Sequence, residues 1–388
     1  MTKKPSYRFV GYTEPWERRK LGEISSRVKG NDGRMDLPTL TISAGQGWLD
    51  QRERFSGNIA GKEQKNYTLL RKGELSYNHG NSKLAKYGVV FQLNNYTEAL
   101  VPKVYHSFKM IDGRSGTFFE YLFATKIPDR ELGKLVSSGA RMDGLLNITY
   151  DDFMSIKLTF PKNNEEQTAI GSFFQDIDQL ISLQQRKLEV LKEQKKTYLK
   201  LLFPAKGQKK PALRFAGFED EWTSVLLGDI SELYQPKTVS SEELLTEGFP
   251  VFGANGYIGY YKDYNHKEDQ VTISARGEGT GTPSFVEGPV WITGNSMVVN
   301  VEKQANIIKP FLYAFCLSFD FKPFVTGGAQ PQLTREVLKK VNIMLPSLPE
   351  QEAIGSFFQD LDKAIAKQEE KVNQLKESKQ TLLRKMFI

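Results

Sequence analysis

The chain has 388 residues, more than one typical domain, and its 39% hydrophobic and 26% charged residues are typical of globular proteins and exclude a disordered chain. Its net charge of +7 is compatible with a polyanionic partner but too small to indicate one by itself. The single Cys316 excludes an internal disulfide framework, and no apolar run is long enough to span a bilayer, so we expect a cytoplasmic protein without membrane anchoring.

Residues 1–160 predict a first α+β domain, because short β-type runs such as Tyr67–Leu70 alternate with glycine turns and amphipathic stretches. Several turns combine glycine with long polar side chains, which can bring hydrogen-bonding groups to the edges of nucleic-acid bases. Each such residue alone is more often only solvated. The candidate contacts of this domain are Arg27, Lys29, Gln46, Arg52, Arg54, Asn78, Asn81, Lys83, Lys86 and Arg141.

Residues 161–203 predict a long central helix, because apolar residues recur at alternating spacings of four and three. An isolated stripe of this kind most simply packs its helix on its own domain. A helix of about 38 residues would be about 57 Å long, however, so much of the stripe needs another partner. The apolar stripe, which we call the seam, contains Ile170, Phe174, Ile177, Ile181, Leu188 and Leu191, with polar interruptions at Gln184 and Lys195.

A Pro/Gly/Lys-rich linker over residues 204–210 precedes a second predicted α+β domain, residues 211–345, with β-type runs such as Val271–Ser274. Its turns have the same character as those of the first domain. Arg276 is suited to guanine and Gln330 or Gln332 to adenine, whereas Arg27 and the lysines are suited to phosphates. The candidate contacts of this domain are Lys237, Asn255, Tyr257, Arg276, Thr280, Gln330, Gln332 and Arg335.

Residues 346–388 predict a C-terminal helix that repeats the central one. Residues 166–203 and 350–387 are identical at 21 of 38 positions, and upstream Leu21-Gly22-Glu23-Ile24 recurs as Leu227-Gly228-Asp229-Ile230. Two equivalent faces of a duplicated chain favour pseudo-two-fold pairing, so we expect an antiparallel coiled coil with the two α+β domains at its opposite ends. The second seam contains Ile354, Phe358, Leu361, Ile365, Val372 and Leu375, interrupted at Gln368 and Lys379.

No catalytic motif stands out. The chain contains no Pro-Pro dipeptide, which the motif of amino-methyltransferases requires, and its three histidines do not form a clustered metal-ligand set. The segment Pro128–Lys134 is only vaguely similar to a nuclease metal site, because its lysine lies one residue too far from Glu131. We therefore expect no catalytic residue, no metal site and no cofactor bound by this chain.

These features together resemble the specificity subunits of type I restriction-modification systems over essentially the whole chain. The most specific marks are the duplicated Glu-Gln-x-Ala-Ile-Gly-x-Phe-Phe helix start, the duplicated Leu-Gly-Glu/Asp-Ile motif, and Gly-Ala-Gln-Pro-Gln-Leu at residues 328–333. The first domain departs from this pattern, having Gly139-Ala140-Arg141-Met142-Asp143-Gly144 where the second has Gln330-Pro331-Gln332. Contact roles therefore should not be copied from one half to the other.

The resemblance implies a non-catalytic subunit whose two target-recognition domains each read half of a split, asymmetric site on double-stranded DNA. The long helices would act as spacer and as docking surface for two methyltransferase subunits, which bind S-adenosylmethionine and methylate adenine. Restriction subunits, if present, would join through this complex and use ATP and magnesium. Three alternatives are a modification-only or type II-like methyltransferase system, a self-contained nuclease and a coiled-coil scaffold without DNA binding.

Overall fold

The computed structural model describes residues 4–52, 61–136, 145–277, 279–328 and 330–388. The chain divides into two compact units. The first unit combines Met1–Gln184 with Lys371–Ile388, and the second unit is Gln185–Glu370. Each unit therefore contains part of both long helices predicted from the sequence.

In the first unit, the largest sheet has four antiparallel strands in the order β2-β9-β6-β7. Three further antiparallel pairs are β1 with β10, β3 with β4, and β5 with β8. The strands are β1 (Glu17–Lys20), β2 (Ser25–Arg27), β3 (Leu40–Ser43), β4 (Gly47–Asp50), β5 (Thr68–Arg71), β6 (Leu75–Asn78), β7 (Val89–Gln92), β8 (Glu98–Val101), β9 (His106–Met110) and β10 (Lys157–Phe160). The short helices are α1 (Leu21–Ile24), η1 (Gly61–Asn66), α3 (Gly116–Ala124), α4 (Asp129–Leu132) and α5 (Tyr150–Ser155).

In the second unit, the largest sheet again has four antiparallel strands, in the order β12-β18-β15-β16. Strand β11 pairs with β19, and a three-stranded sheet has the order β14-β13-β17. The strands are β11 (Thr223–Leu226), β12 (Glu232–Tyr234), β13 (Phe249–Phe252), β14 (Tyr257–Tyr261), β15 (Gln270–Ser274), β16 (Pro283–Val286), β17 (Trp291–Ile292), β18 (Ser296–Asn300) and β19 (Asn342–Leu345). The short helices are α7 (Leu227–Ile230), η2 (Ser241–Glu243), α8 (Lys309–Ser318), η3 (Lys322–Phe324) and α9 (Arg335–Leu338).

The internal duplication is visible in this strand order. In both four-stranded sheets, the strand that follows the duplicated Leu-Gly-acid-Ile turn is an edge strand, β2 in the first unit and β12 in the second. In both units, the strand before the long helix (β10 or β19) pairs with the strand before that turn (β1 or β11). The serine directly after the turn donates its hydroxyl to the carbonyl oxygen of the leucine that begins the turn. This bond joins Ser25 to Leu21 in the first unit and Ser231 to Leu227 in the second. The predicted α+β class and internal duplication are therefore confirmed.

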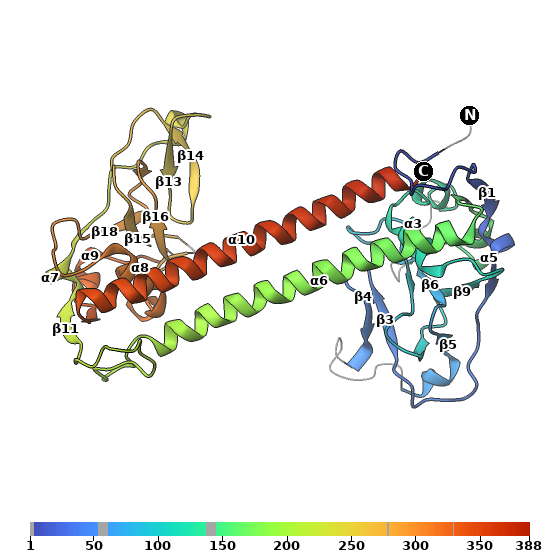
Figure 1. Ribbon diagram of the computed structural model, residues 1–388, viewed down its shortest axis with the longest axis horizontal. Helices are drawn as coiled ribbons and strands as arrows, with labels where there is room; N and C mark the ends of the chain where they lie inside the picture. Colours follow the sequence, from blue (N-terminus) through green and yellow to red (C-terminus); the bar gives the residue numbers. More distant parts are fainter. Residues whose placement is uncertain (1–3, 53–60, 137–144, 278, 329) are drawn as a thin grey trace. The chain divides into compact units, whose positions relative to one another are not determined.

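The two long helices are α6 (Asn164–Leu201) and α10 (Leu348–Met386), green and red in Figure 1. Glycine lets the start of each helix approach its own unit closely. A Cβ at Gly171 would lie 3.0 Å from the Phe118 nitrogen on α3, and one at Gly355 would lie 2.8 Å from the Pro310 Cβ on α8. Within the described residues, no helix is both long and apolar enough to cross a membrane.

The helices pair in antiparallel fashion within each unit. In the first unit Asp178, early in α6, lies 2.6 Å from Lys379, late in α10. In the second unit Lys195, late in α6, lies 2.5 Å from Asp362, early in α10. We call these two contacts the helix ion pairs. They give partners to the two lysines that interrupt the predicted seams.

The predicted seam residues are the less exposed positions of both helices. Ile170, Phe174, Ile354, Phe358 and Val372 are buried. The half-buried members are Ile177, Ile181, Leu188, Leu191, Leu361, Ile365 and Leu375. The first residues of each seam also belong to the core of their own unit, so a seam serves both the domain and the partner helix.

A phenylalanine just past the end of each long helix completes the core of one unit. Phe387 packs against Trp16, Phe118 and Phe174 in the first unit. Its counterpart Phe203 packs against Trp222, Phe311 and Phe358 in the second. Each unit thus needs the end of one long helix and the beginning of the other.

Candidate nucleic-acid interface

Three turns of the second unit meet at one place, and we call them the second-unit turns: residues 253–256, residues 275–277 with 279–282, and residues 326–328 with 330–334. The Leu333 amide donates to the Ala275 carbonyl oxygen at 2.9 Å, and Arg276 pairs with Gln332 as an isolated β-bridge. A Cβ at Gly279 would lie within 2.0 Å of the Asn255 Oδ1. Candidate contacts far apart in the sequence are thereby brought together.

Most predicted contacts on these turns are free to reach a ligand. Five of them are exposed, namely Asn255, Tyr257, Arg276, Gln330 and Gln332. Thr280 is half-buried and uses its hydroxyl within the site, donating to the carbonyl oxygens of Gly277 at 2.6 Å and Pro331 at 3.2 Å. Exposed guanidinium and amide groups on adjacent turns provide the donors and acceptors that base edges require.

The first unit brings together turns at the corresponding places, and we call residues 43–47 and 79–88 the first-unit turns. A Cβ at Gly45 would lie 3.3 Å from the Leu84 Cδ1. The segment Leu145–Ile148 is bonded to the second of these turns, because Gly80 pairs with Leu145 as a β-bridge and the Leu146 amide donates to the His79 carbonyl oxygen at 2.9 Å. This bridge corresponds to that between Arg276 and Gln332.

The predicted contacts of the first unit differ in what they do. Asn78 is half-buried, because its amide donates to the Ile42 carbonyl oxygen at 3.2 Å and accepts from the Gly80 nitrogen at 3.1 Å. It therefore holds two turns together. The exposed candidates on or beside these turns are Gln46, Arg52, Asn81, Lys83 and Lys86, whereas Arg54 and Arg141 lie outside the described residues.

The remaining candidates lie beside the turns. The Arg27 guanidinium is 4.1 Å from the centre of the Tyr150 ring, and burial raises the pKa of Tyr150 to about 12 although the Arg27 charge opposes this. Lys29 and Lys237 are exposed, and Arg335 forms an exposed ion pair with Glu336 at 3.2 Å. Arg27 and Arg335 thus already have partners within their units, whereas the two lysines are exposed.

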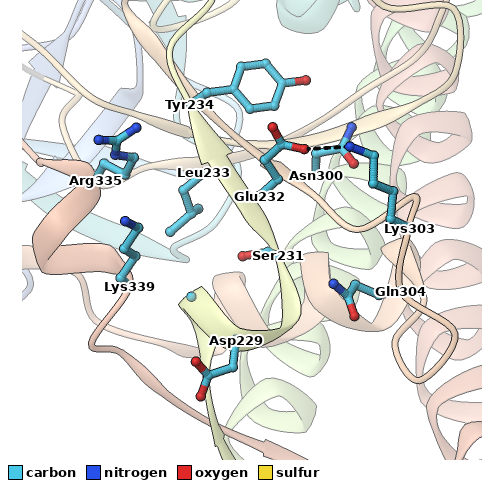
Figure 2. A pocket seen from close by; sticks show the side chains of 11 residues that line it. Asp229, Ser231, Glu232, Leu233, Tyr234, Asn300, Lys303, Gln304, Arg335 and Lys339 are labelled. Atoms are coloured by element: carbon cyan, nitrogen blue, oxygen red, sulfur yellow. Dashed lines mark hydrogen bonds and ion pairs between the residues drawn. The ribbon is translucent and has the colours of Figure 1, made fainter.

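The second unit also contains a polar cavity of about 410 Å³ beside the edge strand β12, shown in Figure 2. Arg335 at the start of α9 and Lys339 directly after this helix line one side, while Glu232 of β12 and Lys303 form an ion pair of 3.3 Å. Lys339 lies 3.3 Å from Glu336. Most of the cationic groups here are thus already paired with carboxylates.

Residues 219–377, which include the second-unit turns, match the family model described as the type I restriction modification DNA specificity domain. This part of the chain is similar to that domain family. A curated relative, the type I restriction enzyme EcoprrI specificity subunit of Escherichia coli, is 24% identical over 155 residues, covering 39% of this chain and 38% of the relative. The match therefore spans well under two thirds of the relative's own length.

Two solved structures are similar to the whole chain. The S subunit of a type I restriction-modification system from M. genitalium is 18% identical with a TM-score of 0.68, covering 100% of this chain and 99% of that one. A chain from a study of complex assembly and conformational transition of a type I R-M system is 17% identical with a TM-score of 0.54, covering 97% and 99%. The fold is shared, and the resemblance predicted from the sequence is confirmed.

Sequence reasoning missed several surface residues of the specificity domain and its helices. Lys339 lies four residues after Arg335, a spacing that places two residues on the same helix face. Because Arg335 was predicted, this spacing could have pointed to Lys339 as well. The exposed apolar residues Leu180, Leu183 and Val190 of α6 are 41%, 65% and 49% exposed and lie off the seam. Their spacing of three and seven is that of a second apolar stripe along the helix.

Proposed function

We propose that the chain is the DNA-recognition subunit of a type I restriction-modification complex, with each set of turns reading one half of a split, asymmetric site on double-stranded DNA. The observation that carries this proposal is a shared frame with different side chains. The β-bridge that closes the turns joins Gly80 to Leu145 in one unit and Arg276 to Gln332 in the other. Two copies of one frame that present different donors and acceptors would read different bases.

The chemistry of the exposed side chains supports this proposal. The Arg276 guanidinium can donate to both acceptors of guanine, and the amide of Gln330 or Gln332 can pair with adenine. Lys83, Lys86 and Lys237 are exposed near these turns and would contact phosphates without reading sequence. Phosphate contacts would make binding strongly dependent on salt concentration.

The long helices are the proposed docking surface for two methyltransferase subunits. Leu180, Leu183 and Val190 leave an apolar stripe of α6 exposed, which is unusual for a helix that pairs through another face. Restriction subunits would join through the methyltransferases. Without them, the chain would serve a modification-only or type II-like methyltransferase system, and cleavage of unmodified DNA in cells distinguishes the two alternatives.

In this proposal the chain performs no chemical step. S-adenosylmethionine would be bound by the methyltransferase subunits and ATP with magnesium by restriction subunits, all in the cytoplasm. The nuclease alternative relies on Glu131, whose carboxylate is 2.6 Å from Lys134 and 3.4 Å from Arg18. The purified chain, supplied with S-adenosylmethionine, ATP and magnesium, should neither methylate nor cut DNA, and activity that survives removal of every partner would favour that alternative.

A domain exchange tests the proposed reading of two half-sites. Residues 228–345 would be replaced by the corresponding domain of a relative, and the methylated motif read by sequencing the DNA of cells that also contain the methyltransferase. We expect one half-site to change and the other to stay. If both half-sites change together, the units do not read independently.

A local variant sharpens the test. Arg276→Ala with Gln332→Ala should relax the half-site read by the second unit, with a loss of about 1–3 kcal/mol of discrimination per bidentate contact. The matched variant Asn81→Ala with Lys83→Ala should affect only the half-site read by the first unit. Unchanged discrimination in both variants would remove the turns as the reading elements.

A further inference from the structure

Two histidines stack in the first unit where β6 leads into the first-unit turns. His79 follows β6 and His106 begins β9, and their ring centres are 4.7 Å apart with an angle of 14° between the planes. His79 is only 3% exposed. Its Nδ1 lies 2.8 Å from the Leu146 carbonyl oxygen, and its Nε2 lies 3.1 Å from the Val104 carbonyl oxygen.

These contacts place the ring between two segments of the first unit. A carbonyl oxygen only accepts hydrogen bonds, so the imidazole is the donor. The closer acceptor is the Leu146 carbonyl oxygen at 2.8 Å, and the Val104 carbonyl oxygen faces the other ring nitrogen. We propose that His79 is a positioning residue that fastens the segment Leu145–Ile148 to the sheet of the first unit.

The fastened segment is part of the proposed reading frame. Leu146 bonds to His79 twice, through the imidazole to its carbonyl oxygen and through its amide to the His79 carbonyl oxygen at 2.9 Å. Leu145 pairs with Gly80, the residue after His79 and the one before Asn81. A change at His79 would therefore move both sides of this bridge and displace the candidate contacts that follow.

His106 extends the attachment by one residue. Its Nε2 lies 2.8 Å from the Ile148 carbonyl oxygen. Burial lowers the pKa of His106, although its hydrogen bond to Ile148 opposes this. A neutral His106 donates its single Nε2–H to the Ile148 carbonyl oxygen and stacks on His79.

The groups around the two rings come from four elements. Tyr77 of β6 has its ring centre 6.0 Å from that of His79, while Tyr150 and Phe153 of α5 contact His106. Among charged groups, Arg27 of β2 covers Tyr150, and the Asp129 carboxylate of α4 acts on Tyr77, whose pKa burial raises. The neighbours of the His79 ring are thus aromatic rings and two carbonyl oxygens.

The second unit lacks this device. Ala275 occupies the position of His79, and the Leu333 amide donates to its carbonyl oxygen just as Leu146 does to that of His79. The Thr280 hydroxyl, which donates to the Pro331 carbonyl oxygen at 3.2 Å, provides a side-chain attachment instead. We therefore expect only the first half-site to depend on a histidine side chain.

The test rests on the proposed function and uses the full chain with its methyltransferase partner. Binding is measured on three DNA duplexes. One carries the motif that the wild-type complex methylates, and each of the other two has one half-site of this motif changed. His79→Ala, which installs the residue of the second unit, should lower affinity for the intact site about tenfold or more and weaken discrimination at the first half-site. Discrimination at the second half-site should persist, which shows that the variant is folded.

A conservative variant separates positioning by hydrogen bonds from a general packing role. His79→Gln keeps a side-chain donor, so it should recover part of the affinity and of the discrimination at the first half-site that His79→Ala loses. His79→Leu fills the same space without a donor and should not recover them. His266→Gln is the matched control in the second unit, where the ring bonds to the Tyr234 hydroxyl, and should leave the first half-site unchanged.

Two results would overturn the inference: wild-type discrimination at the first half-site in His79→Ala, or no recovery in His79→Gln relative to His79→Leu. A wild-type complex that has no methylated motif would instead contradict the proposed function itself.

Discussion

Lys379 of α10 lies 2.6 Å from Asp178 of α6, and the same contact recurs in the second unit with the helices exchanged. There Lys195 of α6 lies 2.5 Å from Asp362 of α10. Each residue corresponds to its counterpart through the repeat offset of 184. One duplicated helix therefore supplies both members of both pairs, which is the reciprocity that two-fold symmetry produces.

The helix ion pairs should be energetically coupled. Lys379 is 19% exposed in its side chain and Asp178 is 41% exposed, so solvent screens the pair only in part. We expect a double-mutant cycle of Asp178→Ala and Lys379→Ala to give a coupling of about 1 kcal/mol in the free energy of unfolding. The cycle at Lys195 and Asp362 should give a similar value.

The neighbouring pair of Lys192 and Glu369 is the matched control, because both of its side chains are about half exposed. Its cycle should give less than about 0.5 kcal/mol. Equal coupling at all three pairs would show that the helix ion pairs are ordinary surface contacts. Denaturant unfolding of each set of four proteins measures the difference.

Another ion pair that occurs once in each unit should contribute more to the free energy of unfolding than the helix ion pairs do. Arg214 donates from Nε and Nη2 to the two oxygens of Glu350 at 2.7 Å, and Arg8 does the same to Glu166 at 2.6 and 2.7 Å. Both carboxylates are 1% exposed, and each hydrogen-bonded glutamate raises the pKa of its arginine. Removing one partner leaves a desolvated charge without compensation.

We therefore expect Glu350→Ala to lower the free energy of unfolding by about 3 kcal/mol. Hydrogen exchange should speed up in the second unit, and Glu166→Ala should do the same in the first unit. The double variant Arg214→Met with Glu350→Leu should recover much of the loss, because no buried charge remains. Loss of exchange protection in both units after Glu350→Ala would contradict this local role.

The sequence predicts the long helices well because their signal is local and repeated. Apolar spacing and 21 identities in 38 positions were enough to indicate the seam and its partner. The helix ion pairs were not predicted, since Asp178 and Asp362 lie one residue off the seam and only the interrupting lysines stood out. Spacing along one helix does not show which residue faces it from another.

The turns show the same division between local and long-range information. Glycine with polar residues correctly indicated turns, but a turn's neighbours depend on how strands far apart in the sequence pair. Asn78 was predicted as a contact, although the structure uses its amide to join two turns. The stacking of His79 on His106 had no sequence signal, because one residue follows β6 and the other begins β9, two strands far apart in the sequence.

A pH-dependent stability should come from Glu120 on α3. Burial raises the pKa of Glu120 to about 7 and the Asp178 charge adds to this, while Lys379 opposes it. Because the folded protein favours the protonated acid, this contribution is fully present below the unfolded value near 4.5 and is lost as pH rises through about 7. Between pH 5 and pH 8 the wild type should lose about 2–3 kcal/mol from this group.

Glu120→Gln keeps the size and polarity of the side chain but does not titrate, so its stability should lack this component of the pH dependence. Urea unfolding at a series of pH values measures the effect. Glu165→Gln, an exposed position at the start of α6, is the control and should retain the wild-type slope. A slope that persists in Glu120→Gln would assign the pH dependence to other groups.

The helices should set the length of the unread gap between the two half-sites. Phe203 lies two residues beyond the end of α6 and is buried in the second unit, so an insertion after it would disturb a core and would not lengthen a helix. We therefore consider four residues inserted into each helix, between residues 184 and 185 and between residues 370 and 371. An insertion of four is tolerated in paired helices because it keeps the alternation of the seam nearly intact.

This double insertion adds about 6 Å of rise and about 40° of rotation to each helix. One base pair adds about 3.4 Å and about 34°, so the gap should lengthen by one or two base pairs while both half-sites keep their bases. The control adds the same four residues to the linker over residues 204–210, whose residues after Pro204 are exposed, and should leave the gap unchanged. Sequencing of methylated DNA reads the motif in both cases. An unchanged gap in a fully active double insertion would show that the helices are not the spacer, and altered bases within a half-site would show that the spacing and the reading of bases are not independent.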